Sequence, residues 1–178
     1  MNCNKATSVL IIGLAFFTLI SIIGKLDLAN AQIDVTKLTG NEKIEITGTL
    51  QPNRYGDQYY EFADKPIVKI NGQVLDFEYP ENGATWGSID ESNLAIDFDL
   101  KIPVTNTLSI VRNFDIPCDP DSIEHNPSDG STTYRTNSDC YIIFSDVFFN
   151  NLDFTVVMNK DKTGGSFHAT AQGKYFSG

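Results

Sequence analysis

The clearest pattern in the chain is a strict alternation of apolar and polar residues over positions 94–104. Every second residue of this stretch is apolar, whereas Asp97, Asp99 and Lys101 occupy intervening positions. A strand points successive side chains to opposite faces of a sheet, whereas a helix would spread these apolar residues around its circumference. The pattern therefore predicts a β-strand whose apolar face consists of Leu94, Ile96, Phe98, Leu100, Ile102 and Val104.

A second pattern predicts a tight β-hairpin around Asn71 and Gly72. Both flanking segments are strand-like, and an Asn-Gly pair suits a type I′ turn because both central residues of that turn need a positive φ. A two-residue turn of this kind pairs Ile70 with Gln73. We therefore expect one buried face that consists of Val68, Ile70, Leu75 and Phe77.

Further strands are predicted between clusters of Asn, Asp, Gly and Pro, which are typical of turns. Residues 141–149 are apolar on both faces, which is typical of a central strand. The segment from Gln32 to Leu38 is expected to form either one more strand or a loose tail. The remaining predicted strands cover residues 42–50, 108–116, 152–158 and 166–176.

These elements together predict the fold class. No window of helical length shows a period of 3.6 residues after position 31, and no repeat or linker divides the chain. Several antiparallel strands with one apolar face each are typical of sandwiches and barrels. The sequence thus predicts an all-β, single-domain antiparallel β-sandwich over residues 32–178, with a closed β-barrel as the alternative.

The N-terminal 31 residues are typical of a secretory signal peptide. Lys5 supplies the positive charge, residues 6–24 are almost uninterruptedly apolar, and Ala29-Asn30-Ala31 has small residues at the two positions that signal peptidase reads. An uncleaved anchor is the alternative, because an apolar run of about 19 residues can span a bilayer. Cleavage after Ala31 would also remove Cys3.

The charge balance narrows the choice of partners. The full chain carries a net charge of −10, and removal of residues 1–31 takes away Lys5, Lys25 and Asp27, which leaves −11. Such an acidic protein is repelled by phosphate backbones and by anionic membrane surfaces. We therefore expect neither a nucleic-acid partner nor a membrane after cleavage, but a protein or a carbohydrate at the cell surface.

Cys118 and Cys140 are the two cysteines of the predicted mature chain. A single pair of cysteines in an exported protein is typical of a structural disulfide. The residues between them read as a long, polar and acidic loop that this disulfide closes at its base.

Carboxylate and amide oxygens within this loop suggest a calcium site, because calcium prefers such a mixture of hard ligands. When Gly130 is aligned with the invariant glycine of the helix-flanked calcium loop, however, His125 and Pro127 fall where two ligands are required. A solvated acidic loop is therefore the alternative interpretation. The candidate calcium ligands are Asp119, Asp121, Glu124, Asp129 and Asp139.

Aromatic residues in or beside the predicted loops are candidates for ligand binding. Exposed aromatic rings can stack on the faces of sugars, and Tyr55, Tyr59 and Trp86 are the candidates for this role. The alternative is that such rings cap the ends of the hydrophobic core.

The sequence contains no pattern typical of an enzyme, such as a Gly-x-Ser-x-Gly nucleophile elbow or a His-Glu-x-x-His zinc motif. We therefore expect a non-enzymatic surface or extracellular protein, secreted or cell-surface, that binds a ligand or has a structural role. Self-assembly through Gln32 to Leu38 by strand addition is one variant of this hypothesis. The alternatives are a carrier with an apolar cavity and a hydrolase that uses two carboxylates.

Overall fold

The computed structural model describes residues 33–53, 59–81, 85–136 and 140–173. Within these residues, thirteen antiparallel strands form one continuous hydrogen-bonded sheet. The strands are β1 Lys43–Pro52, β2 Tyr59–Phe62, β3 Ile67–Ile70, β4 Gln73–Val74, β5 Thr85–Ile89, β6 Leu94–Pro103, β7 Ser109–Cys118, β8 Ser122–His125, β9 Thr132–Thr136, β10 Ile142–Phe144, β11 Val147–Phe149, β12 Asp153–Met158 and β13 Gly165–Gln172.

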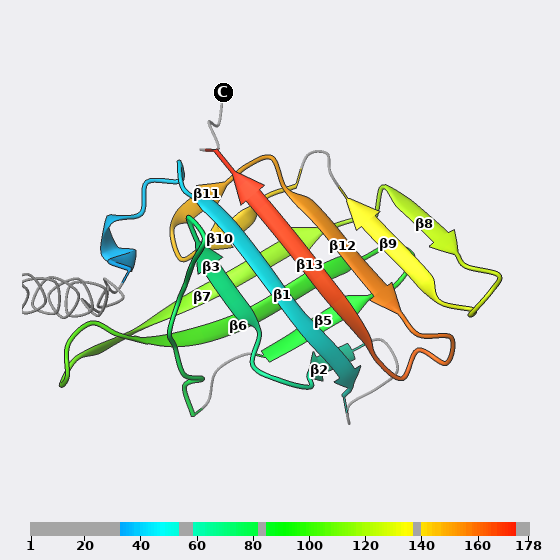
Figure 1. Cartoon of the computed structure of the whole chain (residues 1–178), viewed down its shortest axis with the longest axis horizontal. Coiled ribbons are helices and arrows are strands. Elements are labelled where there is room, and N and C mark those ends of the chain that lie inside the picture. The colour runs from blue at the N-terminus through cyan, green and yellow to red at the C-terminus, as the bar shows by residue number, and fades with distance from the viewer. Residues whose placement is uncertain (1–32, 54–58, 82–84, 137–139, 174–178) are drawn as a thin grey trace, which may run out of the picture. The chain divides into compact units, whose positions relative to one another are not determined.

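The sheet curls into a half-barrel, in which β1, β13, β12 and β9 lie in front of β5, β6 and β7 (Figure 1). The strand order is β11-β10-β7-β6-β5-β2-β1-β13-β12-β9-β8, and β3 and β4 branch from β1. Strand β2 connects the two layers, because it pairs with β1 on one edge and with β5 on the other. The all-β prediction is confirmed, but neither two separate sheets nor a closed barrel forms, since this path of described strands ends at β11 and β8.

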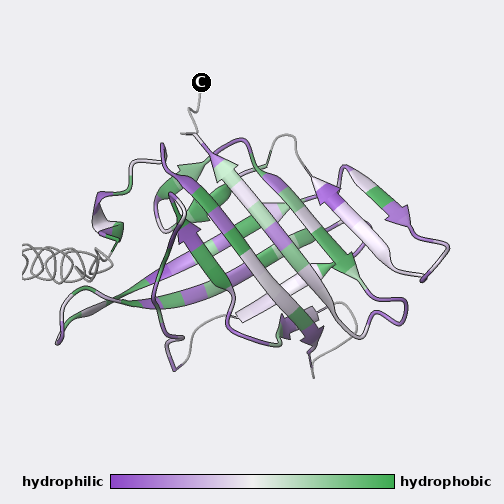
Figure 2. Ribbon diagram, in the orientation of Figure 1, coloured by the Kyte–Doolittle hydropathy of each residue, from purple (hydrophilic) through white to green (hydrophobic). Residues whose placement is uncertain are grey.

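Several predicted elements are present with the expected burial. In β6 every second residue from Leu94 to Ile102 is at most 1% exposed, although Val104 lies beyond the strand and is exposed. The predicted type I′ turn is confirmed, because Asn71 and Gly72 have φ values of 51° and 81°. Figure 2 shows the resulting alternation of apolar and polar residues along β1 and β6.

Aromatic rings fill the space between the two layers of the curled sheet. Phe62 lies with its ring centroid 5.6 Å from that of Phe167 on β13 and 5.3 Å from that of Phe98 on β6. The contacts continue from Phe98 to Phe114 at 5.2 Å and from Phe114 to Phe144 at 5.1 Å. All of these residues except Phe62 are at most 3% exposed, so the two layers share one aromatic core.

The predicted central strand over residues 141–149 is wrong. This segment is instead a tight hairpin of β10 and β11, and β11 is the last strand of the sheet. The chain reverses at Ser145, which has a φ of 60°, and the Ser145 N–H donates a hydrogen bond to the Asn113 carbonyl oxygen on β7. The segment is mostly apolar because Ile142, Phe144 and Phe149 of its two short strands contribute to the core.

The interpretation of residues 119–139 as one long loop is also wrong. The segment contains the hairpin of β8 and β9, and β9 pairs with β12 along its whole length. Thr132, Tyr134 and Thr136 alternate inward and are buried, whereas β8 is exposed throughout. Alternation of Thr and Tyr is a strand signal, but the polar composition of the segment obscured it.

The predicted disulfide between Cys118 and Cys140 is present, with a Cα–Cα distance of 5.7 Å. Cys118 ends β7 and Cys140 precedes β10, so the bond links the two points where the chain leaves and rejoins the layer of β6 and β7. The two cysteines are 22 residues apart in sequence. Closing a loop of this length stabilises the folded state by about 3 kcal/mol in the chain-entropy account.

The start of the described chain is neither a strand nor a loose tail. Val35–Lys37 forms a single 3-10 turn, and the Asp34 carboxylate accepts a hydrogen bond from the Thr36 N–H at 3.2 Å. Val35 is 7% exposed and belongs to the core, against which Ile33 and Leu38 also pack. The apolar residues that motivated strand addition thus contact the chain's own core.

Candidate functional site

A row of directly paired residues crosses the outer face of the back layer. Trp86 on β5 pairs with Asp97 on β6, which pairs with Asp115 on β7. Asp115 then pairs with Ile143 on β10, and Ile143 with Phe148 on β11. Directly opposed residues share one face of a sheet, so these side chains all lie on the same side. We call this row the outer strip: Trp86, Asp97, Asp115, Ile143 and Phe148.

The burial of neighbouring residues shows that the outer strip faces away from the core. Asp97 lies between Ile96 and Phe98, both 0% exposed, and the residues on either side of Asp115 are also fully buried. Phe148 is 39% exposed, whereas the following residue, Phe149, is 0% exposed. Side chains alternate between the two faces of a strand, so the outer strip lies on the surface. Its five residues come from β5, β6, β7, β10 and the edge strand β11.

An aromatic pair forms one end of the outer strip. The rings of Tyr59 and Trp86 meet edge-on, with centroids 6.2 Å apart and an interplanar angle of 77°. Tyr59 is 46% exposed because the adjacent Tyr60 takes the inward position on β2 and is 2% exposed. Two of the three predicted aromatic ligand residues are thus adjacent on the surface, and the third, Tyr55, lies outside the described residues.

A second aromatic pair forms the other end of the outer strip. The ring centroids of Tyr141 and Phe148 are 5.5 Å apart, and both side chains extend from the edge hairpin. The sequence reasoning missed this pair because it treated residues 141–149 as one buried strand. A usable signal was Ser145-Asp146, two polar turn residues in the middle of the apolar run.

Polar groups occupy the centre of the outer strip. The Asn113 side-chain amide donates hydrogen bonds to the Asp97 carboxylate at 2.8 Å and to the Asp99 carboxylate at 3.2 Å. Partial burial raises the pKa of Asp97, and the Asp99 carboxylate raises it further, whereas the hydrogen bond from Asn113 lowers it. Partial burial likewise raises the pKa of Asp115, with a smaller contribution from Asp97.

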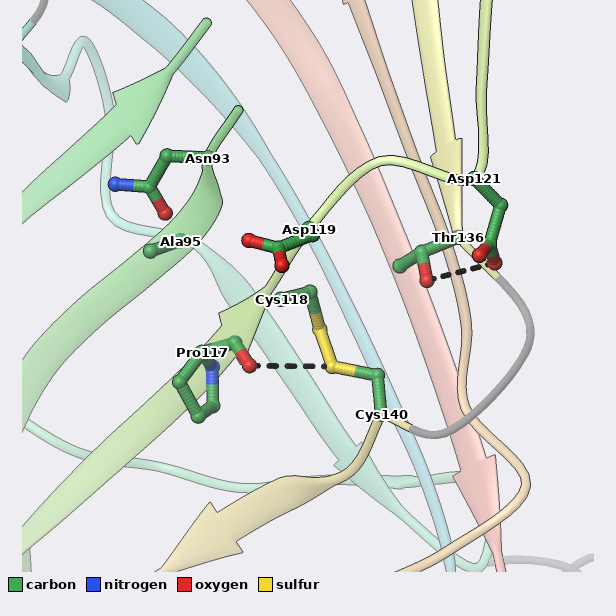
Figure 3. Close-up of a pocket in the computed structure, with 8 residues that line it drawn as sticks. All are labelled: Asn93, Ala95, Pro117, Cys118, Asp119, Asp121, Thr136 and Cys140. Carbon is green, nitrogen blue, oxygen red and sulfur yellow. Dashed lines mark hydrogen bonds between the residues drawn. A yellow bond between two sulfur atoms is a disulfide. The ribbon is translucent and has the colours of Figure 1, made fainter. Parts of the chain in front are cut away.

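A pocket of about 490 Å³ lies at the disulfide end of β6 and β7 (Figure 3). Ala95 and Pro117, which pair directly, form part of its wall and lie two residues along their strands from Asp97 and Asp115. The Thr136 hydroxyl donates a hydrogen bond to the Asp121 carboxylate at 3.0 Å across the other side. The lining residues are Asn93, Ala95, Pro117, Cys118, Asp119, Asp121, Thr136 and Cys140.

The predicted calcium ligands do not gather at one place in the described part of the chain. Asp119 and Asp121 line the disulfide pocket, but Glu124 is exposed on β8. Asp129 lies in the turn between β8 and β9, where hydrogen bonds from Ser131 lower the pKa of its carboxyl. Asp139 lies outside the described residues. No three His, Cys, Asp or Glu side chains of the described residues are grouped closely enough to hold a metal ion.

Neither histidine belongs to the strands that carry the outer strip. His125 Nδ1 lies 3.0 Å from the Thr132 hydroxyl oxygen at the end of β8. His168 is on β13 in the front layer, and its side chain is exposed as the alternation of that strand predicts. The ionisable groups of the outer strip are therefore carboxylates alone.

The chain matches no protein-family model, and neither a curated protein nor a solved structure matches it. Within the residues that the structure describes, no helix has the length and apolar character needed to cross a membrane. The outer strip and the disulfide pocket are therefore the features from which a function can be inferred.

Proposed function

We propose that this protein is an exported, non-enzymatic glycan-binding protein whose ligand contacts Trp86 and Tyr59. The observation that carries the proposal is the surface pair of the exposed Tyr59 and the half-buried Trp86, directly beside the hydrogen-bonded group of Asp97 and Asn113. Its place is outside the cell, secreted or at the cell surface, in keeping with the apolar N-terminal run and the disulfide.

Aromatic rings and carboxylates recognise complementary parts of a sugar. The C–H groups on the face of a pyranose ring carry small positive charges, and the face of an aromatic ring is negative. The hydroxyl groups at the edge of the sugar are hydrogen-bond donors and acceptors, which Asp and Asn can satisfy. Trp86 and Tyr59 thus offer an apolar platform, while Asp97 and Asn113 offer polar groups that fix the orientation of a ligand.

The partial burial of the carboxylates strengthens this argument. A hydrogen bond to a charged group in a partly desolvated position contributes more than one at a fully exposed position. The raised pKa of Asp97 reflects such partial desolvation. Partial burial limits the hydrogen bonds that the Asp97 carboxylate can accept from water. A sugar hydroxyl that donates to this carboxylate would supply such a hydrogen bond, which favours binding.

The test is glycan-array binding of the mature protein, followed by calorimetry on the glycans that bind. The array carries uncharged and anionic glycans of two to eight units. We expect Trp86→Ala to weaken binding by roughly 30-fold, because truncation of a central aromatic residue in a binding site typically costs about 2 kcal/mol.

The matched control is Ile67→Ala, which truncates a 51% exposed apolar side chain on β3 in the other layer. This variant should bind like the wild type, and circular dichroism should show that both variants retain the fold. Absence of binding to every glycan on the array, or binding that Trp86→Ala leaves unchanged, would contradict the proposal.

A carboxylate-based glycoside hydrolase is the second candidate function. The observation that favours it is the direct pairing of Asp97 and Asp115, both with a raised pKa, because such enzymes use two facing carboxyl groups of which one is protonated. Release of new reducing ends from the bound glycans, abolished in Asp115→Asn, would favour hydrolysis over binding alone.

A further inference from the structure

We propose that the outer strip binds an extended, unbranched and uncharged glycan chain that reaches from Trp86 to a second stacking platform formed by Tyr141 and Phe148. This inference rests on the proposed function and adds the length, the charge and the second contact of the ligand. It assigns a role to two residues of the edge hairpin that the proposed function does not use.

The second platform follows from the exposure and contacts of the edge hairpin. Phe148 is 39% exposed at the last strand of the sheet, and Tyr141 packs against it with ring centroids 5.5 Å apart. Two adjacent aromatic rings on the outer face of a sheet edge offer an apolar surface on which a sugar ring can stack. Tyr141 and Phe148 thus resemble the Tyr59–Trp86 pair in composition and in position on the outer face.

The register sets the distance between the two platforms. Four strand-to-strand steps separate Trp86 on β5 from Phe148 on β11, along the pairs Trp86–Asp97, Asp97–Asp115, Asp115–Ile143 and Ile143–Phe148. With neighbouring strands about 4.8 Å apart, these steps span roughly 19 Å. A pyranose ring advances an extended glycan by about one such strand spacing, so a chain of about five rings is needed to place one ring on each platform.

The residues between the platforms define the charge of the ligand. Asp97 and Asp115 lie along the path, Asn113 bridges Asp97 and Asp99, and no residue of the outer strip is basic. An anionic sugar would face these carboxylates at short range, and the outer strip itself has no basic side chain that offsets the repulsion. Hydroxyl groups of an uncharged glycan can instead donate to the carboxylates, so the row offers stacking at both ends and hydrogen bonding between them.

The experiment compares ligand length in the wild type and in Phe148→Ala. The probes are linear β-1,4-linked glucose and N-acetylglucosamine oligomers of two and six units, together with a galacturonate hexamer and every uncharged glycan that binds on the array. For the uncharged class that binds, we expect the hexamer to bind the wild type about tenfold more tightly than the dimer, a difference of about 1.4 kcal/mol.

In Phe148→Ala the hexamer should lose this advantage, whereas the affinity for the dimer should not change. Tyr141→Ala tests the same platform from the residue that precedes β10. Val157→Ala is the matched control, because Val157 is 37% exposed on β12 in the opposite layer. Thermal melting shows whether each variant is folded. If one of Phe148→Ala and Tyr141→Ala is unfolded, the hexamer affinity of the other one tests the inference.

The results separate this inference from the proposed function. If dimers bind as tightly as hexamers, if both platform variants bind hexamers like the wild type, or if the galacturonate hexamer binds best, the inference is wrong and glycan binding at Trp86 stands. If no glycan binds at all, both are wrong. Dimerisation of the chain through Phe148, seen by light scattering and lost in Phe148→Ala, would also overturn the inference.

Discussion

At the scale of single residues, the pairing of Asp97 with Asp115 places two carboxylates directly opposite each other on the outer face. Like charges directly opposite each other destabilise an antiparallel pair by an amount of order 0.5 kcal/mol. Asn113 offsets part of this effect by donating to Asp97. A stabilising hydrophobic or neutral pair would be easy to encode at these positions, so the two carboxylates are consistent with a role in ligand binding.

The raised pKa of Asp115 predicts how the free energy of unfolding depends on pH. The pKa of Asp115 is raised in the folded state, so its contribution to stability is fully present below the ordinary carboxyl value of 3.8 and is lost as the pH rises through the raised value. Asp115→Asn should therefore raise the free energy of unfolding at pH 7, and the gain should vanish below pH 3.8. Urea unfolding of the wild type and of Asp115→Asn, at pH 7 and at a pH below 3.8, measures this difference in the free energy of unfolding.

The control for this prediction is Asp153→Asn, which changes an exposed carboxylate on β12. This variant should have nearly the same stability as the wild type at pH 7. A destabilised Asp115→Asn at pH 7 would show that the Asp115 carboxylate accepts a hydrogen bond that matters more than its partial burial.

At the scale of elements, the hairpin of β8 and β9 changes the interpretation of the segment between the cysteines. Tyr134 on β9 is 2% exposed and pairs with Val156 on β12 and with Ile123 on β8. Strand β9 therefore extends the front layer and covers part of the core. The disulfide fixes the base of an integral hairpin, not of an isolated loop.

This interpretation predicts a large effect of Tyr134→Ala. Removal of a buried aromatic side chain typically costs about 3 kcal/mol or more, because a cavity remains where the ring was. We expect a loss of this size in urea unfolding, compared with less than about 1 kcal/mol for Tyr59→Ala, whose side chain is exposed. Equal effects of the two variants would show that β9 is not packed on the core.

At the scale of the whole molecule, the aromatic core counts against the carrier hypothesis. A carrier needs an apolar cavity of several hundred Å³, typically about 300–1,000 Å³. Here the space between the layers holds Phe62, Phe98, Phe114 and Phe144 in successive ring contacts. The described pocket at the disulfide is bounded in part by Asp119, Asp121 and Thr136, which suit polar ligands.

The ring contacts between the two layers predict that the wild-type protein does not bind apolar ligands. A fluorescent fatty acid titrated into the folded protein should show no saturable binding at micromolar concentrations. Calorimetry with the same fatty acid checks the result without relying on fluorescence. Saturable binding with one ligand per chain would favour the carrier hypothesis and would require the Phe contacts to rearrange.

Which side chains face the core could be predicted from the sequence for most strands, because side-chain direction in a strand alternates with a fixed period. The sequence also predicted the turn at Asn71-Gly72, which depends on local φ preferences, and the disulfide, since Cys118 and Cys140 are the two cysteines after position 31. The tight reversal at Ser145 was missed, because apolar residues on both sides of it masked two short strands.

Which strands are neighbours could not be predicted from the sequence and is known from the folded structure. Lateral pairing depends on contacts between residues far apart in sequence, such as Asp97 with Asp115 and Asp115 with Ile143. The alternation of each strand is compatible with many strand orders, so it cannot place Trp86, Asp97 and Phe148 in one row. The predicted aromatic residues Tyr59 and Trp86 became part of a candidate site because β2, β5 and β6 lie side by side in the curled sheet.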